Sequence, residues 1–246
     1  MENKKRTRLT YKRNNGSGGG GSVHDTEIDE EYLIQKITEK LVPKKKKKLN
    51  FDSEEEEQTI FLRDNHLYYS DHVMLCNVDK VKQLMRDYLN QVEELQSIKF
   101  ARNFTPKPLY LHINSSGGDL LAGLTLYDFI VEYSTHIPVH TIIEGLAASA
   151  ATIISVAGVK RYITPSSYLL IHQLSTVFGG TYSNIKDEKE NCDKLMQKIT
   201  EIYLGKSKLT KKKLEELLAR DIYLSASESK KYGLVDEIKS VDIFND

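Results

Sequence analysis

Residues 139–157 read VHTIIEGLAASAATIISVA and contain three local signals in succession. Residues 139–143 are rich in β-branched side chains and predict a strand. Gly145 permits a turn that other residues resist, and the alanine-rich run to residue 156 favours a helix. Ser149 falls where that helix begins, beside N–H groups that have no partner within the helix. Such groups stabilise negative charge, so the position suits an acyl-transfer nucleophile, although small residues at such turns also serve close packing.

The chain around this stretch repeats the same pattern from residue 60 onward. Residues 60–69 predict strand segments, and residues 78–95 place apolar side chains on one helical face. A strand at 109–113 runs into a glycine turn, and a helix follows to about residue 133. Two successive strand, turn and helix units favour parallel strands joined by right-handed crossovers. Later segments predict strands at 160–163 and 168–171, a β-rich stretch at 173–182, helices over 183–204 and 211–220, and a capping box at Ser225 and Glu228 whose helix ends at Gly233.

Composition restricts the class of protein. A length of 246 residues with 39% hydrophobic residues is enough for one packed domain plus tails, and 35 basic residues balance 35 acidic ones. Cys76 and Cys192 form neither a disulfide framework nor a metal-binding motif. The chain contains no run of 18 apolar residues and no secretory signal. We therefore expect a soluble, intracellular, cytoplasmic protein without a metal or other cofactor, a nucleic-acid partner or a membrane partner.

Residues 1–57 differ in composition from the rest of the chain. They contain a glycine-serine segment at 16–22, five lysines at 44–48 and four glutamates at 54–57. This composition buries too little apolar surface to offset chain entropy, so we predict a polar, disordered tail at 1–57. Apolar residues at helical spacing allow a short amphipathic helix at 28–42 within it. The lysine run is either a solvated charge run or a nuclear-import or nucleic-acid patch. The folded domain is predicted over 58–246.

Three further features could contribute to a site together with Ser149. Gly117 and Gly118 lie in the first strand-to-helix turn, where glycine lets a main-chain N–H approach a substrate carbonyl. His172 ends an apolar strand and turns into polar sequence, and Asp221 separates a basic helix end from apolar residues 222–224. Each has an ordinary structural explanation by itself: a tight turn, a core histidine and a capping carboxylate.

Together these features resemble the Clp protease proteolytic subunit family of self-compartmentalising serine peptidases. The family motif INSPGG appears as INSSGG at 113–118, GQAASMG as GLAASAA at 145–151, and MIHQP as LIHQL at 170–174. The catalytic aspartate before FLSA and the following YGLVD correspond to DIYLSA at 221–226 and YGLVD at 232–236. The resemblance covers about residues 60–240. It implies an α/β fold, the ClpP/crotonase-like repeated ββα spiral, with a protruding strand-helix handle at 173–204.

The resemblance also implies roles for individual residues. Ser149 attacks the peptide carbonyl, His172 is the general base and then the general acid, and Asp221 holds the imidazole tautomer. The N–H groups of Gly118 and Ala150 form the oxyanion hole. The residues that the family places against the substrate are Gly117, Gln173 and Leu174. The expected activity is that of an ATP-dependent serine endopeptidase subunit that hydrolyses unfolded proteins or peptides inside an oligomeric chamber through an acyl-enzyme.

The family further implies a homo-oligomer of stacked rings and an AAA+ unfoldase in trans, because the chain has no phosphate-binding loop for ATP. Partner docking corresponds to Tyr110, Ile142 and Tyr162, which keep the apolar character of the family groove. His112, Glu144 and Thr164 of the same groove are more polar than the family pattern. Other departures from the family sequence are Ser116 and Leu174, both proline in the family, and Ala150-Ala151, which are Met-Gly.

Two other functions are compatible with parts of this pattern. A non-catalytic ring subunit would keep the fold and assemble with an active relative, although a complete triad argues against it. A crotonase-like enzyme acting on acyl thioesters would share the spiral and the oxyanion hole without needing a serine nucleophile. A signal-peptide-peptidase relative would use serine with lysine and a membrane anchor, which the sequence lacks.

Overall fold

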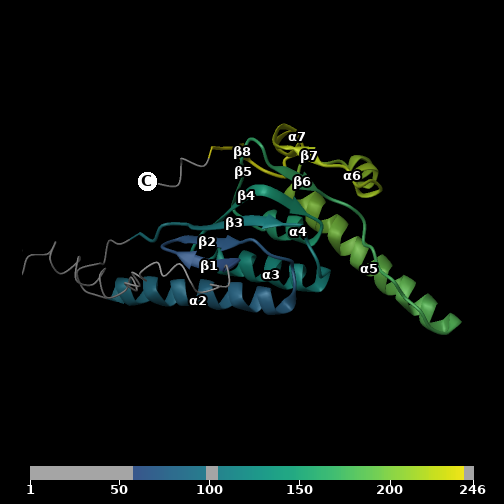
Figure 1. Cartoon of the computed structure of the whole chain (residues 1–246), viewed down its shortest axis with the longest axis horizontal. Coiled ribbons are helices and arrows are strands. Elements are labelled where there is room, and N and C mark those ends of the chain that lie inside the picture. The colour runs from purple at the N-terminus through teal and green to yellow at the C-terminus, as the bar shows by residue number, and fades with distance from the viewer. Residues whose placement is uncertain (1–57, 98–104, 241–246) are drawn as a thin grey trace, which may run out of the picture. The chain divides into compact units, whose positions relative to one another are not determined.

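The computed structural model of this chain describes residues 58–97 and 105–240. The predicted tail at 1–57, with its helix at 28–42, lies outside the described residues. Figure 1 shows the order of the elements. They are β1 (Ile60–Arg63), β2 (His66–Tyr69), α2 (Leu75–Ser97), β3 (Leu109–Ser115), α3 (Leu120–Tyr133), β4 (Val139–Ala148), α4 (Ala150–Ser155), β5 (Lys160–Ile163), β6 (Tyr168–Leu170), α5 (Tyr182–Lys206), α6 (Lys211–Leu218), β7 (Leu224–Ser225), α7 (Ala226–Lys231) and β8 (Glu237–Ile238).

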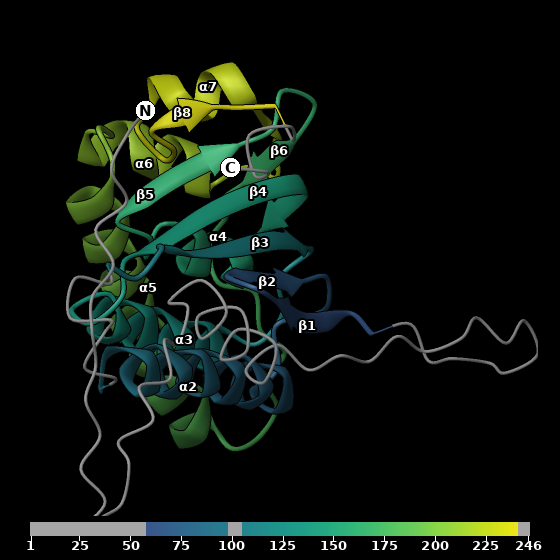
Figure 2. The same ribbon diagram turned by 90° about the vertical axis from the view of Figure 1, so that its left-hand side faces the viewer.

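The strands of the described residues form a mixed sheet, seen across its strands in Figure 2. The strand order is β1-β2-β3-β4-β5-β8, and β6 leaves this path to pair with both β4 and β7. β1 and β2 form an antiparallel hairpin, whereas β2, β3, β4 and β5 run parallel. α3 connects β3 with β4, and α4 lies between β4 and β5, as parallel pairing requires. The predicted α/β fold class is confirmed.

The hydrophobic core lies between the sheet and the helices beneath it. α2, α3 and α4 lie on one side of the strands in Figure 1. The strand residues Leu109, Leu111 and Ile113 alternate along β3 and are fully buried, as expected for one face of a pleated strand. α2 begins three residues earlier than predicted and presents its own buried stripe to this face, formed by Val78, Val81, Met85 and Val92. This packing fixes the carboxyl ends of β3 and β4, where the glycine turn and Ser149 lie.

β4 differs from the sequence prediction, because Gly145 does not end the strand. The strand continues to Ala148, with Gly145 at φ 87 inside it. The register between β3 and β4 shifts there, so that Ala147 faces Ser115 after Ile143 has faced Ile113. Gly145 therefore forms a β-bulge, a role that glycine also fills. The extension lets residues 146–148 pair with β6, and the turn moves to Ser149.

The segment before α5 also differs from the prediction. Residues 173–182 are β-rich in sequence, yet among the described residues no strand pairs with residues 173–181. A strand requires a neighbouring backbone, and the part of the chain that the structure describes supplies none there. α5 extends away from the sheet in Figure 1, and its buried residues Ile199, Ile202 and Tyr203 all belong to its C-terminal part. Its N-terminal part is the helical portion of the predicted handle.

Within residues 58–97 and 105–240, no helix is both long enough and apolar enough to cross a membrane.

An ion pair between β5 and the residue before β8 supplies a pH-dependent part of the stability. Both carboxylate oxygens of Asp236 accept from Arg161, at 2.6 Å from Nη2 and 3.1 Å from Nε. Burial alone would raise the pKa of Asp236, but the hydrogen bonds and charge of Arg161 outweigh it and lower that pKa below 3.8. A depressed folded-state pKa stabilises the fold above the unfolded value, and this contribution is lost as the pH falls through the folded one.

We expect Asp236→Asn to lower the free energy of unfolding at pH 7 by about 1–2 kcal/mol, a value reduced because the carboxylate is partly solvated. Denaturant titrations of the variant and the parent from pH 7 to pH 2 measure the effect. The difference should begin to shrink as the pH falls below about 3.8 and should disappear only below the lower, folded-state pKa of Asp236. The control Glu216→Gln breaks the exposed pair with Lys213 and should cost under about 0.5 kcal/mol. A loss independent of pH would show that the charge of Asp236 contributes nothing.

Candidate active site

Ser149 lies between β4 and α4 in a backbone conformation that few residues other than glycine adopt, with φ 54 and ψ −128. Its N–H donates to the Leu170 carbonyl of β6 at 2.9 Å, and its carbonyl accepts from the Thr152 N–H at 2.9 Å. Ser149 is the N-cap of α4, but its side chain makes no capping hydrogen bond. The Ser149 hydroxyl is therefore not engaged in a hydrogen bond to the start of α4. Backbone outliers of this kind occur at functional sites, where the surrounding structure holds them.

The Gly117-Gly118 turn packs directly against the Ser149 turn. Gly117 has φ 94, and a Cβ atom there would lie 2.7 Å from Ser149 Cβ and 2.5 Å from the Ala148 carbonyl oxygen. Only glycine fits this approach. The turn is held by Val73, whose N–H donates to the Gly117 carbonyl at 2.9 Å and whose carbonyl accepts from Asp119 at 2.7 Å. Neither bond uses the Gly118 N–H, the predicted oxyanion donor.

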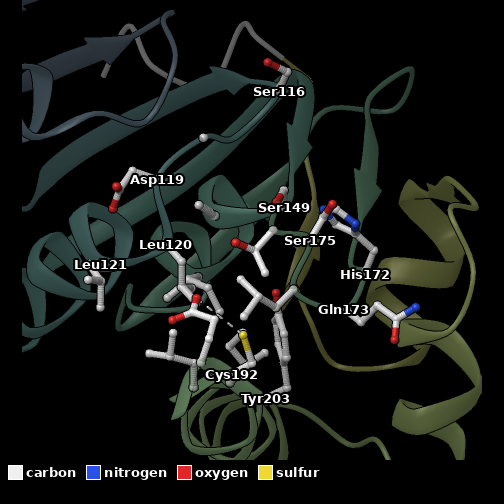
Figure 3. A pocket seen from close by; sticks show the side chains of 18 residues that line it. Ser116, Asp119, Leu120, Leu121, Ser149, His172, Gln173, Ser175, Cys192 and Tyr203 are labelled. Carbon is white, nitrogen blue, oxygen red and sulfur yellow. Dashed lines mark hydrogen bonds between the residues drawn. The ribbon is translucent and has the colours of Figure 1, made fainter. Parts of the chain in front are cut away.

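Strand pairing brings His172 close to Ser149. β6 lies beside residues 146–148 of β4, and the Leu170 carbonyl accepts from Ser149, so the residue two positions later lies next to the nucleophile turn. Ser149 and His172 line the same cavity, which has a volume of about 510 Å³. Figure 3 shows both among the side chains that line it. Within the described residues no hydrogen bond joins the two side chains. Catalytic hydrogen bonds are often long without substrate.

Asp221 pairs with His172 from the segment that follows α6. The Gln173 N–H donates to the Leu218 carbonyl at 2.8 Å, which holds the His172 segment beside the end of α6. Asp221 follows that helix, and its Oδ1 lies 3.3 Å from His172 Nδ1. The two side chains are 80% and 24% exposed, respectively, so the pair is open to solvent. The arrangement places a carboxylate on one imidazole nitrogen and leaves the other available for a proton transfer.

The remaining predicted site residues fall in different places. Gly118, Ala150, Gln173 and Leu174 line the cavity with Ser149, whereas Gly117 lies behind it against the nucleophile turn. The Leu174 N–H donates to Met196 Sδ at 3.2 Å, which ties the segment to α5. Sequence reasoning missed the apolar floor of the cavity, formed by Leu120, Ile153, Leu195, Ile199 and Tyr203. Leu195, Ile199 and Tyr203 recur at helical spacing within the predicted helix at 183–204, and that periodicity was the available signal.

The predicted docking residues lie on three neighbouring strands. Tyr110, Ile142 and Tyr162 belong to β3, β4 and β5, and Ile142 is in register with Tyr162. Ile142 and Tyr162 are buried, with 1% and 4% exposure, and Tyr110 is half-buried.

The polar residues expected in the same groove find partners. His112 Nδ1 lies 2.8 Å from Glu144 Oε1, and the Thr164 hydroxyl bonds to Ser167. A carboxylate on this face is therefore compensated by a partner.

The described residues contain no group of three or more His, Cys, Asp or Glu side chains placed to bind one metal ion.

Comparisons with known proteins place these observations in a family. The family model for Clp protease matches residues 64–242, a range that includes all the candidate site residues described above. The chain is 34% identical over 159 residues to the ATP-dependent Clp protease proteolytic subunit 2 of Treponema denticola, covering 64% of this chain and 76% of the relative. It is 36% identical over 140 residues to the ATP-dependent Clp protease proteolytic subunit of Staurastrum punctulatum, covering 54% and 67%. This protein therefore belongs to the Clp protease family.

Proposed function

We propose that this chain is a serine endopeptidase that hydrolyses peptide bonds of unfolded proteins or peptides. The observation that carries the proposal is the proximity of three residues that are distant in sequence: Ser149 in a strained turn, His172 lining the same cavity as Ser149, and Asp221 at 3.3 Å from His172 Nδ1. The hydroxyl that is not used as a helix cap is available as a nucleophile.

The mechanism follows from this arrangement. Asp221 accepts from the Nδ1–H of His172, which leaves Nε2 unprotonated to remove the proton of Ser149 as Oγ attacks the carbonyl carbon. The negative oxygen of the tetrahedral intermediate is received by the N–H groups of Gly118 and Ala150. His172 then donates its proton to the leaving amine, and water hydrolyses the acyl-enzyme by the same steps.

The cavity geometry supports a polypeptide substrate. Residues 173–176 line the cavity, and no strand among the described residues pairs with them. A substrate backbone can pair with such a segment, a common mode of peptide recognition. Gln173 and Leu174 would then contact the substrate, and the apolar floor would accept an apolar side chain.

Assembly into stacked rings is proposed from the surface of the handle. Apolar side chains are exposed along residues 177–185, including Val177, Phe178, Tyr182 and Ile185. A clustered apolar surface of this kind favours association. Both matched relatives are named as ATP-dependent proteolytic subunits, which supports an AAA+ unfoldase in trans. Burial of Ile142 and Tyr162 restricts what a docking loop would contact in the proposed groove.

Active-site labelling tests the proposal. The purified full chain is treated with a fluorophosphonate probe, and the modified residue is identified by peptide mass spectrometry. Three serines line the cavity, namely Ser116, Ser149 and Ser175, and only Ser149 should be modified. A non-catalytic ring subunit or a crotonase-like enzyme would remain unlabelled. The mass of the labelled protein in solution tests the ring assembly separately.

A further inference from the structure

A buried chain of hydrogen bonds leads from α5 to the backbone of Ser149. The Thr152 hydroxyl lies 2.6 Å from the Ser149 carbonyl oxygen and 2.5 Å from the Tyr203 hydroxyl. A carbonyl only accepts, so Thr152 donates its one hydrogen to Ser149. Tyr203 must therefore be the donor to Thr152. The donors are therefore fixed: the Tyr203 O–H donates to Thr152 Oγ1, and the Thr152 O–H donates to the Ser149 carbonyl.

These two hydrogen bonds end at Ser149, the residue whose backbone is strained. The φ of 54 at Ser149 is rare for a residue with a side chain and persists only where neighbours hold it. An N-cap serine ordinarily uses its own hydroxyl to accept from the second or third N–H of the helix. In this protein Thr152, the third residue of α4, directs both its N–H and its hydroxyl to the Ser149 carbonyl instead. The main chain is held, and the Ser149 hydroxyl remains available.

Tyr203 is well suited to orient Thr152. Its side chain is buried at the C-terminal part of α5, and its ring forms part of the cavity floor in Figure 3. Burial raises the pKa of Tyr203, while the bond to Thr152 lowers it less, so the hydroxyl keeps its proton at neutral pH. Thr152 itself is fully buried and does not line the cavity. Neither hydroxyl competes with water, so each has a defined direction.

We propose that Thr152 and Tyr203 are positioning residues that hold Ser149 in its reactive conformation and couple it to the buried end of α5. The inference rests on the proposed function, because it assigns a role to groups behind the nucleophile. Loss of the Thr152 hydroxyl leaves one bond on the Ser149 carbonyl instead of two and lets the turn relax. A displacement of about 1 Å at a reacting atom lowers turnover on the order of 10²-fold.

The experiment compares Thr152→Val, which keeps the shape without the hydroxyl, with Thr152→Ser, which keeps the hydroxyl. We expect Thr152→Val to lower kcat for a fluorogenic peptide and the rate of fluorophosphonate labelling by about 10–100-fold, with KM within about twofold of the parent. Thr152→Ser should stay within about threefold of the parent, because the bond to Ser149 is retained. Tyr203→Phe should lower kcat by about 3–10-fold. The double variant Thr152→Val, Tyr203→Phe should resemble Thr152→Val alone, since both act on one chain of bonds.

Tyr133→Phe is the matched control for stability. Its hydroxyl is also buried and donates at 2.9 Å to a backbone carbonyl, that of Met85, away from the site. Its thermal stability should fall as that of Tyr203→Phe does, with kcat unchanged.

Three results would each overturn the inference: full labelling of Thr152→Val, equal loss in Thr152→Ser, or equal loss of kcat in Tyr133→Phe. If the parent protein itself is not labelled, the proposed function fails first. A labelled parent with an unaffected Thr152→Val variant overturns only the positioning role.

Discussion

Ser149→Ala protein is expected to hydrolyse a fluorogenic peptide with a kcat about 10⁶-fold below that of the parent. Without Oγ no acyl-enzyme forms, and only substrate binding and the proposed oxyanion donors, the N–H groups of Gly118 and Ala150, remain. The substitution should leave the fold intact, because the Ser149 side chain makes no capping bond and its backbone bonds to Leu170 and Thr152 persist. Steady-state rates and thermal unfolding of both proteins, purified in parallel, provide the measurement.

Ser116→Ala and Ser175→Ala are the matched controls, since both serines line the same cavity. Each should keep kcat within about threefold of the parent. A Ser149→Ala variant that retains more than about a hundredth of the parental rate would remove Ser149 from the mechanism. An enzyme of the crotonase-like type, in which the oxyanion hole acts without a serine, would then be the better explanation.

Local signals in the sequence were sufficient to predict most of the elements. The strands β3, β5 and β6 and the helices α2, α3, α5 and α6 all fall where periodicity and turn residues placed them, within a few residues. The capping box at Ser225 and Glu228 and the helix end at Gly233, with φ 70, are also confirmed. These features depend on neighbours in sequence, because caps and amphipathic faces form within one or two helical turns.

The two errors of the fold prediction share a non-local cause. Gly145 was predicted as a turn, but the pairing of residues 146–148 with β6 carries the strand past it. Residues 173–182 were predicted as β-rich, but no described strand lies beside residues 173–181. Whether a glycine becomes a turn or a bulge, and whether an extended segment becomes a strand, is determined by what lies next to it. A single sequence does not contain that information locally.

The candidate site also combines features that the local sequence predicts with features that depend on distant contacts. Motif spacing indicated Ser149, His172 and Asp221, and these three do approach one another. The floor of the cavity and the support behind Ser149 were not predicted, because a helical face reads as ordinary core. Thr152 within an alanine-rich helix and Tyr203 on α5 carry no signal until the two hydroxyls are found 2.5 Å apart. The sequence thus indicated the three residues of the proposed triad, whereas only the structure showed which groups lie behind them.

Asp221→Asn is expected to lower kcat by about 10²–10⁴-fold. The amide can present its NH₂ group to His172 Nδ1, which favours the imidazole tautomer with its proton on Nε2, and that tautomer does not accept the proton of Ser149. The amide also fails to stabilise the imidazolium that forms during attack. The lower end of this range is a smaller decrease in kcat than is expected for a buried triad carboxylate. The Asp221 side chain is 80% exposed, so water replaces part of its effect.

Asp193→Asn is the appropriate control for this substitution. Asp193 lines the second cavity beside His172 together with Asp221, but its carboxylate pairs with Lys189 at 2.5 Å rather than with the imidazole. Its kcat should remain within about twofold of the parent, so that a general effect of removing negative charge near the site is separated from a specific one. KM for the peptide should change little in Asp221→Asn, because the carboxylate orients the base and does not contact the substrate. If Asp221→Asn is as active as Asp193→Asn, Ser149 and His172 act without the carboxylate. Solvent at this exposed position would then orient the imidazole as well as Asp221 does.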